Sequence, residues 1–361
     1  MALRSYLTYT RIQDVRNVRN VRNPPRKLWR GNCMQYLHFE HIQTLVSKIA
    51  LGTTYFGTSI DSHTAHTMLD YFVSQGGTTI DTARLYGQSY PGGPSLSEQT
   101  IGRWITLNNM RKHIVLVTKG LASEPSGASR YSYKNLMLDI DRSQQELQTD
   151  YFDVWFLHRD DPSVPVDEVM DMVAPLVESG VIQTLGASNW TTERINLANT
   201  YAQKHNLPQF EASEIHWSLA QSTPESWQDT SLVCMSESEL AWYRKHQMPI
   251  FAYASQAKGF FSKAIAHGLE GLNTKSRNRF LQPENIARLE RVKRLSQELH
   301  VSPAAIAVGY ITHEQPPSVA LVGCSSLPQL ADTLTGSDLY LNPRQISYLL
   351  GVGEEESNNA T

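Results

Sequence analysis

The chain has 361 residues, of which 40% are hydrophobic and 19% are charged, values that are ordinary for a globular protein. Its apolar runs fall well short of the roughly 20 residues that a membrane-spanning helix needs, so no membrane partner is predicted. The net charge is −3, with about +7 on residues 1–35 and about −10 on the remainder. An acidic folded surface excludes nucleic acid as a partner, because phosphate groups are bound by clustered Lys and Arg.

The first 35 residues are predicted to be an extension of the chain. They hold seven Arg, a single acid and a short Arg-Asn-Val repeat, a composition that fits either a disordered segment or a mitochondrial targeting peptide. We therefore predict one barrel domain at 36–352 and a tail at 353–361. The three cysteines, Cys33, Cys234 and Cys324, are widely spaced and odd in number, which favours a reducing, cytoplasmic compartment and predicts no metal site.

From residue 48 onward, strand-like and helix-like runs alternate. The first helix is predicted from an apolar stripe with helical spacing, which Asp61 or Ser62 caps and Gly76 ends. The stripe consists of Ala65, Met68, Leu69, Phe72 and Val73. Further helices are predicted at 97–107, 133–148 and 166–178, and another begins at Thr191 or Thr192. The apolar strand-like runs lie at 49–53, 78–81, 114–118, 152–157, 181–186, 210–215, 249–253 and 318–322.

Eight short strands that alternate with helices predict an α/β fold, a (β/α)₈ TIM barrel. Residues 36–47 are predicted to form a hairpin that plugs one end of the barrel. Two long irregular stretches, 218–235 and 257–283, are predicted to form walls of a cofactor and substrate cleft, because idle loops of that length are uncommon.

Four polar residues lie where successive strands end. They are Asp81, Tyr86, Lys119 and His158. Because strand ends share one rim of such a barrel, these side chains are expected to converge. Reduction of a carbonyl group needs a proton donor at the oxygen and a hydride that protein side chains cannot supply. Tyr86 is the candidate acid, Lys119 is expected to lower its pKa, and Asp81 is expected to hold Lys119. His158 is expected to orient the substrate.

The same residues carry a resemblance to the aldo-keto reductase family. The matching motifs are 81–87, 118–119, 157–158 and 188–189, and the resemblance covers roughly residues 36–352. It is strongest for the bacterial and fungal branch that reduces aldehydes and ketones with NADPH. The resemblance implies a small-molecule carbonyl substrate and a monomeric or weakly oligomeric oxidoreductase.

The resemblance also implies a set of cofactor-binding residues. Gly52, Thr53, Thr54 and Asp81 would lie beside the nicotinamide ribose, Ser188 and Asn189 would hold the carboxamide, and Tyr253 would stack on the ring. The family usually has Gln where this chain has Glu214. A carboxylate cannot donate to the carboxamide oxygen unless it is protonated, so either that contact is lost or Glu214 accepts from the amide nitrogen.

The last strand resembles the segment of the family that binds the adenosine 2′-phosphate. Gly323 and Gln329 stand where many relatives have Lys and Arg, whereas Ser325 and Ser326 begin a helix that can bind phosphate. NADPH is therefore the expected cofactor, and NADH is the alternative. Arg277 and Arg279 could replace the missing basic side chains, or they are simply solvated.

A substrate pocket is predicted from mostly aromatic side chains near the rim. Its residues are Tyr55, Tyr90, Arg159, Trp190 and Trp217. Arg159 would bind an anionic group of the substrate or pair with Asp160 or Asp161. Two other functions stay open: a nicotinamide-binding barrel that regulates a partner, as the potassium-channel β subunits of the same family do, and an aldolase barrel that uses Lys119 as a Schiff base.

Overall fold

The computed structural model describes residues 34–90, 92–123, 128–313 and 316–352. Eight parallel strands close into a barrel in the order β10, β3, β4, β5, β6, β7, β8 and β9. The strands are β3 (Ile49–Gly52), β4 (Thr79–Asp81), β5 (Val115–Gly120), β6 (Phe152–Leu157), β7 (Ile182–Ser188), β8 (Ala212–His216), β9 (Ile250–Tyr253) and β10 (Ser318–Val322). The (β/α)₈ barrel predicted from the sequence is confirmed.

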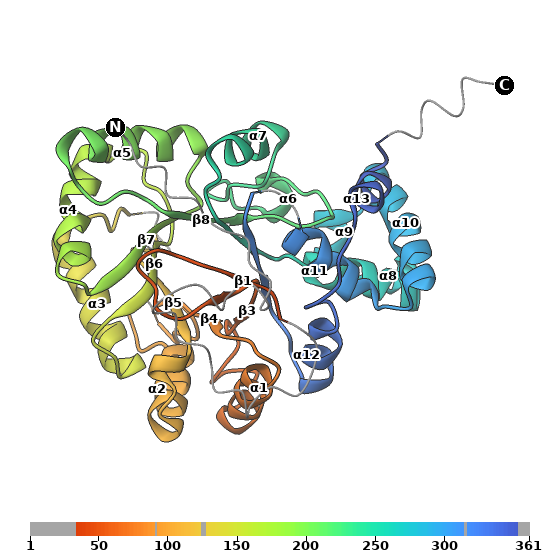
Figure 1. Ribbon diagram of the computed structural model, residues 1–361, viewed down its shortest axis with the longest axis horizontal. Helices are drawn as coiled ribbons and strands as arrows, with labels where there is room; N and C mark the ends of the chain where they lie inside the picture. The colour runs from red at the N-terminus through yellow and green to blue at the C-terminus, as the bar shows by residue number, and fades with distance from the viewer. Residues whose placement is uncertain (1–33, 91, 124–127, 314–315, 353–361) are drawn as a thin grey trace, which may run out of the picture.

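The helices surround the barrel as a ring (Figure 1). Those between the first strands are α1 (Ser62–Ser74), α2 (Leu96–Asn108), α3 (Tyr133–Leu147), α4 (Val166–Glu178) and α5 (Thr192–His205). The later ones are α6 (Pro224–Trp227), α7 (Glu237–His246), α8 (Phe260–His267), α9 (Thr274–Phe280), α10 (Pro283–Leu299), α11 (Pro303–His313), α12 (Leu327–Leu334) and α13 (Pro343–Leu350). Short 3₁₀ turns are η3 (Arg111–His113), η4 (Ala257–Gly259) and η5 (Leu269–Gly271).

Local signals in the sequence explain where the first helices begin and end. The Asp61 side chain accepts hydrogen bonds from two backbone N–H groups of the first turn of α1, and the predicted apolar stripe of that helix is buried. Thr191 caps α5 in the same way. Helix α4 has the bounds predicted from the sequence and is followed by Gly180, whose φ of +78° suits glycine.

The predicted hairpin is present as β1 (Tyr36–Leu37) and β2 (Val46–Ser47), which pair antiparallel. Its Phe39 ring lies 6.3 Å from that of Phe251 on β9. Leu37, Phe39, Ile42 and Val46 form one buried cluster with the residues inside the barrel. Figure 1 shows the hairpin in red, lying across the centre of the barrel. The hairpin therefore closes the end of the barrel where its strands begin.

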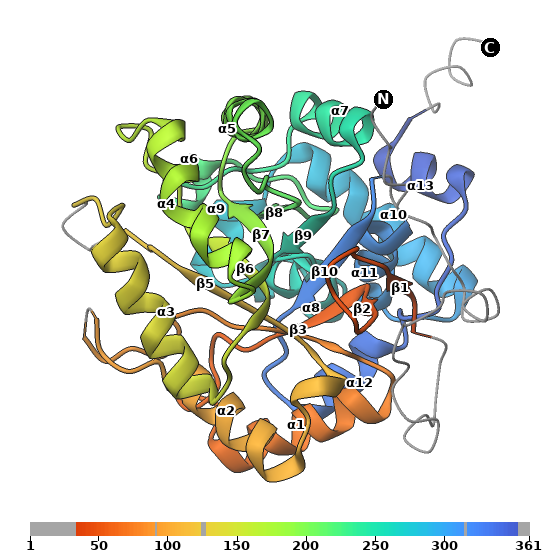
Figure 2. The ribbon, with the colours of Figure 1, turned by 60° about the vertical axis from the view of Figure 1, so that its left-hand side comes forward.

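The prediction of two long irregular stretches is wrong for 257–283. This segment contains η4, α8, η5 and α9, whereas 218–235 contains only the four-residue helix α6. Gly259 and Gly268 have φ values of +78° and +73° and separate these helices from one another. Helix α8 packs on α10, and α10 packs on α13; Figure 1 shows the three helices together on one side of the barrel, and Figure 2 shows α10 and α13 there from another direction.

Alternation along the strands decides which side chains face the barrel interior. The cluster inside the barrel contains Val115, Val117, Val154, Phe156 and Phe251. Their neighbours in sequence, such as Leu116 and Trp155, belong to the other cluster, between the barrel and its helices. Because side chains alternate with a period of two, residues two positions further along each strand also face inward. This pattern determines which polar groups meet at the rim.

Candidate active site

The alternation turns one polar side chain from most strands toward the centre of the rim. Lys119 follows Val117 on β5, His158 follows Phe156 after β6, and Glu214 follows Ala212 on β8. Asp81 ends β4, and Tyr86 lies five residues later in the loop that leads to α2. The fold thus places the predicted catalytic residues at one end of the barrel, opposite the hairpin.

The structure brings the four predicted catalytic side chains together. Nζ of Lys119 lies 2.5 Å from Oδ1 of Asp81 and 5.2 Å from the centre of the Tyr86 ring. The rings of Tyr86 and His158 lie 6.1 Å apart and nearly perpendicular, at 79°. A phenol, an ammonium, a carboxylate and an imidazole therefore converge at the rim.

Lys119 is a buried ammonium between two carboxyl groups. Its Nζ donates to Asp81 and to the backbone oxygen of Thr82, at 2.9 Å, and contacts Oε2 of Glu214 at 3.4 Å. Burial lowers the pKa of Lys119, but Asp81 and Glu214 raise it more, so the net pKa lies above its ordinary value. A charged amine cannot attack a carbonyl group, which disfavours the Schiff-base alternative.

Lys119 lowers the pKa of Tyr86 as expected, but the net pKa is nevertheless raised. Burial raises the pKa of Tyr86 to about 12, and the lowering by Lys119 is countered by the negative charges of Asp81 and Glu214. The phenol therefore keeps its proton at neutral pH. A group that must give a proton to an oxygen atom needs to be in this form.

His158 is a neutral imidazole at the same rim. Burial lowers its pKa well below the ordinary value, and the positive charges of Arg159 and Lys119 lower it further. Its Nδ1 is buried without a hydrogen-bond partner among the described residues. A neutral ring can donate one hydrogen bond and accept another, as binding to a polar ligand requires.

A buried ionic network that was not predicted from the sequence supports the loop that carries Tyr86. Nη1 of Arg84 lies 2.8 Å from Oε2 of Glu98 and 2.6 Å from Oε2 of Glu146. Oε1 of Glu98 accepts from the hydroxyl of Thr118, the neighbour of Lys119, at 2.7 Å. The network joins this loop to β5, so it fixes Tyr86 relative to Lys119.

The residues expected beside the nicotinamide ribose fall into buried and exposed positions. Thr53 is buried, and its hydroxyl donates to the backbone oxygen of Asp81 at 2.8 Å, so it supports the end of β4. Gly52 pairs with Asp81 in the register of β3 and β4, and Thr54 is exposed at the rim. Thr53 therefore acts on the site through Asp81.

The residues expected at the carboxamide lie together at the ends of β7, β8 and β9. Asn189, with a φ of +58°, donates from Nδ2 to the Ser188 hydroxyl at 3.1 Å. Its Oδ1 accepts from the Tyr253 hydroxyl at 2.6 Å. The Asn189 amide is thus engaged by protein groups. The Glu214 side chain is 3% exposed, and its Oε2 has no hydrogen-bond donor among the described residues.

The predicted phosphate segment lies at the start of α12. The Ser325 backbone N–H and hydroxyl both donate to Oε1 of Gln329, at 3.0 and 2.7 Å, and the Ser326 hydroxyl caps the helix. Arg277 donates to two backbone oxygens of its own loop, and Arg279 stacks over Trp227 at 3.8 Å. The two arginines are therefore held by other contacts.

Two of the five residues expected in a substrate pocket lie in the core. Trp190 is fully buried and packs on Phe210. Trp217 lies two positions after Ile215 and, like Ile215, faces the surrounding helices, so its side chain is only 3% exposed. Tyr55 and Tyr90 are 51% and 63% exposed and remain at the surface. The expectation that the two tryptophans line an open pocket is not met.

Arg159 pairs with a residue that the sequence did not suggest. Asp160 is bound by Arg194 at 2.8 Å, so it is not the partner of Arg159. Instead, Nη2 of Arg159 contacts Oδ2 of Asp229 at 3.5 Å, and both side chains are partly exposed. Asp229 lies 70 positions further along the chain, and only the fold brings it near Arg159.

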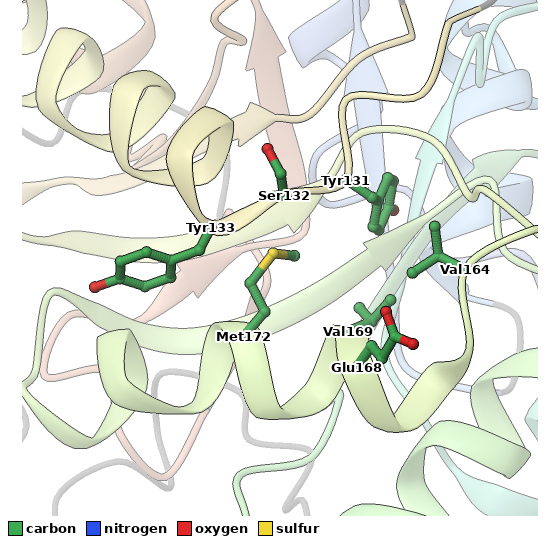
Figure 3. Close-up of a pocket in the computed structure, with 7 residues that line it drawn as sticks. All are labelled: Tyr131, Ser132, Tyr133, Val164, Glu168, Val169 and Met172. Carbon is green, nitrogen blue, oxygen red and sulfur yellow. The ribbon is translucent and has the colours of Figure 1, made fainter.

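A surface pocket lies between the first turns of α3 and α4, and the hydroxyl of its Tyr131 donates to the backbone oxygen of Arg159, next to His158. Figure 3 shows its lining side chains Tyr131, Ser132, Tyr133, Val164, Glu168, Val169 and Met172. None of them belongs to the cluster around Lys119. In the described part of the chain, no group of three or more His, Cys, Asp or Glu side chains could hold a metal ion. No helix there is long and apolar enough to cross a membrane.

Comparison with known proteins agrees with this geometry. The rim cluster in a closed parallel barrel defines an enzyme of the (β/α)₈ class, and the profile of the Aldo/keto reductase family matches residues 48–354. The chain belongs to the aldo/keto reductase family and is an oxidoreductase. Members of this family generally use NAD(P)H.

Three similar proteins illustrate the range of relatives. Norsolorinic acid reductase stcV of Emericella nidulans is 27% identical, over 83% of this chain and 76% of its own length. A norsolorinic acid reductase of Aspergillus flavus is 29% identical over the same shares. The uncharacterized oxidoreductase YrpG of Bacillus subtilis is 25% identical, over 86% of this chain and 93% of its own length. The relatives are thus fungal and bacterial.

Proposed function

We propose that this protein reduces an aldehyde or a ketone and that Tyr86 donates the proton to the carbonyl oxygen. The observation that carries the proposal is the position of the Tyr86 ring, 5.2 Å from the ammonium of the buried pair of Lys119 and Asp81, and the raised pKa of the phenol agrees with it. The ammonium stabilises negative charge that develops on the phenol oxygen as the proton leaves. The neutral His158 ring binds the carbonyl oxygen and orients it toward Tyr86.

A bound nicotinamide would supply the hydride, which no protein side chain can provide. The rim offers buried polar atoms that fit such a group, because Oε2 of Glu214 and Nδ1 of His158 have no hydrogen-bond partner among the described residues. Ser188 and Asn189 lie beside Glu214 on the neighbouring strand and would complete its binding site. NADPH is the expected cofactor, with Ser325, Ser326 and Gln329 near its 2′-phosphate, and NADH is the alternative.

The proposal can be tested by following NADPH absorbance at 340 nm with 4-nitrobenzaldehyde as substrate. The wild-type protein should oxidise NADPH, and Tyr86→Phe should lower kcat at least about 100-fold, since a general acid contributes 10²- to 10⁴-fold. Tyr133→Phe is the matched control, because Tyr133 is an exposed tyrosine at the start of α3. Equal rates for wild type and Tyr86→Phe would contradict the role of Tyr86. Tight NADPH binding without turnover would favour a regulatory barrel.

We also propose a monomeric or weakly associated enzyme in the cytoplasm. Cys234 and Cys324 form no disulfide, in keeping with a reducing compartment, while Cys33 lies outside the described residues. The alternative of a mitochondrial targeting peptide also concerns residues outside the described part of the chain. Light scattering of the purified protein tests the state of association, and fractionation of cells tests the compartment.

A further inference from the structure

Two buried carboxyl groups at the rim, those of Asp81 and Glu214, share the single ammonium group of Lys119. Nζ of Lys119 lies 2.5 Å from Asp81 and 3.4 Å from Glu214, and both acids are 3% exposed. Asp81 holds the closer, hydrogen-bonded position, whereas Oε2 of Glu214 receives no hydrogen bond from the described residues. One positive charge can neutralise only one of the two carboxylates. Burial raises the pKa of both acids, and the shorter contact of Lys119 with Asp81 favours the ionised form of Asp81 over that of Glu214.

The groups around Glu214 make its charge sensitive to pH. The charges of Lys119 on β5, Asp81 on β4 and Arg159 after β6 shift the pKa of Glu214. The charge of Glu214 in turn shifts the pKa of Tyr86 in the loop between β4 and α2 and that of Tyr253 on β9. Burial raises the pKa of Glu214 to about 8, Lys119 opposes this rise, and Asp81 adds to it. We therefore expect Glu214 to be mostly neutral at pH 6.5 and mostly ionised at pH 9.5.

We propose that Glu214 is a positioning residue that controls when Tyr86 gives up its proton. When ionised, Glu214 shares Lys119 with Asp81 and places a second negative charge beside the phenol, which then holds its proton more firmly. When neutral, it leaves Lys119 to stabilise the phenolate. This inference rests on the proposed carbonyl reduction by Tyr86.

The consequence is a pH-dependent effect on one direction of the reaction. Oxidation of an alcohol needs the Tyr86 phenolate as a base, and below the pKa of Tyr86 its rate follows the phenolate fraction. A like charge nearby shifts a pKa by about one unit or more. Removing the Glu214 charge should therefore raise alcohol oxidation about tenfold more at pH 9.5 than at pH 6.5. Carbonyl reduction uses the protonated phenol, so any effect of the substitution on reduction, including one through cofactor binding, should be the same at both pH values.

The first experiment measures Glu214 directly, without need of activity. Protein labelled with ¹³C at the glutamate carboxyl carbons is titrated by NMR, and the resonance of Glu214 is the one lost in Glu214→Gln. Its midpoint should lie near pH 8, far above the ordinary value of 4.5. A midpoint near 4.5 would overturn the proposal, because Glu214 would then be ionised throughout the working range.

The second experiment compares kcat/KM for oxidation of 4-nitrobenzyl alcohol by NADP⁺ between pH 6.5 and 9.5. The ratio of Glu214→Gln to wild type should rise about tenfold from pH 6.5 to pH 9.5, while the ratio of Glu214→Asp, which keeps the carboxyl group, to wild type should not change with pH. The matched control is Glu211→Gln, whose side chain lies 3.7 Å from His41, away from Lys119. A purely structural loss would lower both directions equally at every pH.

The outcomes separate this inference from the proposed function. A pH-independent ratio in an enzyme whose turnover depends on Tyr86 would refute the role of Glu214 and leave the carbonyl reduction intact. Wild-type protein without Tyr86-dependent turnover in either direction would refute the proposed function, and with it the role of Glu214.

Discussion

Replacing Arg84 by Met should destabilise the fold more than any nearby surface change. The Arg84 guanidinium is buried and pairs with Glu98 and Glu146, and the Glu98 side chain is fully buried. Removing the arginine leaves Glu98 with the hydroxyls of Thr118 and Ser143 as its remaining partners. Breaking a buried pair by removing one partner costs about 3 to 5 kcal/mol. We expect a loss of this size in the free energy of unfolding at pH 7.5.

The loss should be smaller at acidic pH. Burial already raises the pKa of Glu98, and Arg84 opposes that rise. Without Arg84, the Glu98 carboxyl group binds a proton more tightly in the folded state than in the unfolded state. The free energy of unfolding of the variant therefore falls as pH rises above the pKa that Glu98 has in the unfolded state. Urea unfolding of wild type and Arg84→Met at pH 5.0 and 7.5 measures the loss of unfolding free energy at each pH. Arg103→Met, at an exposed position, is the control. An equal or larger loss at pH 5.0 would refute the reasoning.

Two further changes test other parts of the structure. Asp229→Asn removes the partly exposed ion pair with Arg159, which contributes at most about 1 kcal/mol. The KM for 4-carboxybenzaldehyde should fall up to about fivefold, because the substrate carboxylate no longer competes with Asp229, whereas an unchanged KM would count against Arg159 as an anion site. Phe72→Ala empties a fully buried position on α1 and should cost about 3 to 5 kcal/mol in urea unfolding. A loss below about 1 kcal/mol would show that the helix repacks.

The fold and the convergence of the rim residues were accessible from the sequence for a simple reason. Parallel strands in a closed barrel end at one rim, so Asp81, Lys119 and His158 had to meet once the strands were recognised. Caps such as Asp61 and a glycine such as Gly180 marked helix ends locally.

What the sequence did not reveal depends on contacts between distant segments. Trp217 faces the helices because of its place in the strand alternation, and composition alone made it look like a pocket residue. Asp229 reaches Arg159 only through the fold. The pKa of Tyr86 is the balance of burial against several charges, and burial is not visible in a sequence. Frequent glycines hid the short helices within 257–283, because they break the apolar periodicity.

The hairpin at the far end of the barrel has a consequence for how ligands come and go. Phe39 and its neighbours pack against the side chains that fill the barrel interior, so they close the end where the strands begin. A ligand of Tyr86 therefore approaches from the opposite face, where the strands end. Substitutions in the hairpin should then act on the stability of the barrel and leave the approach to the rim unchanged.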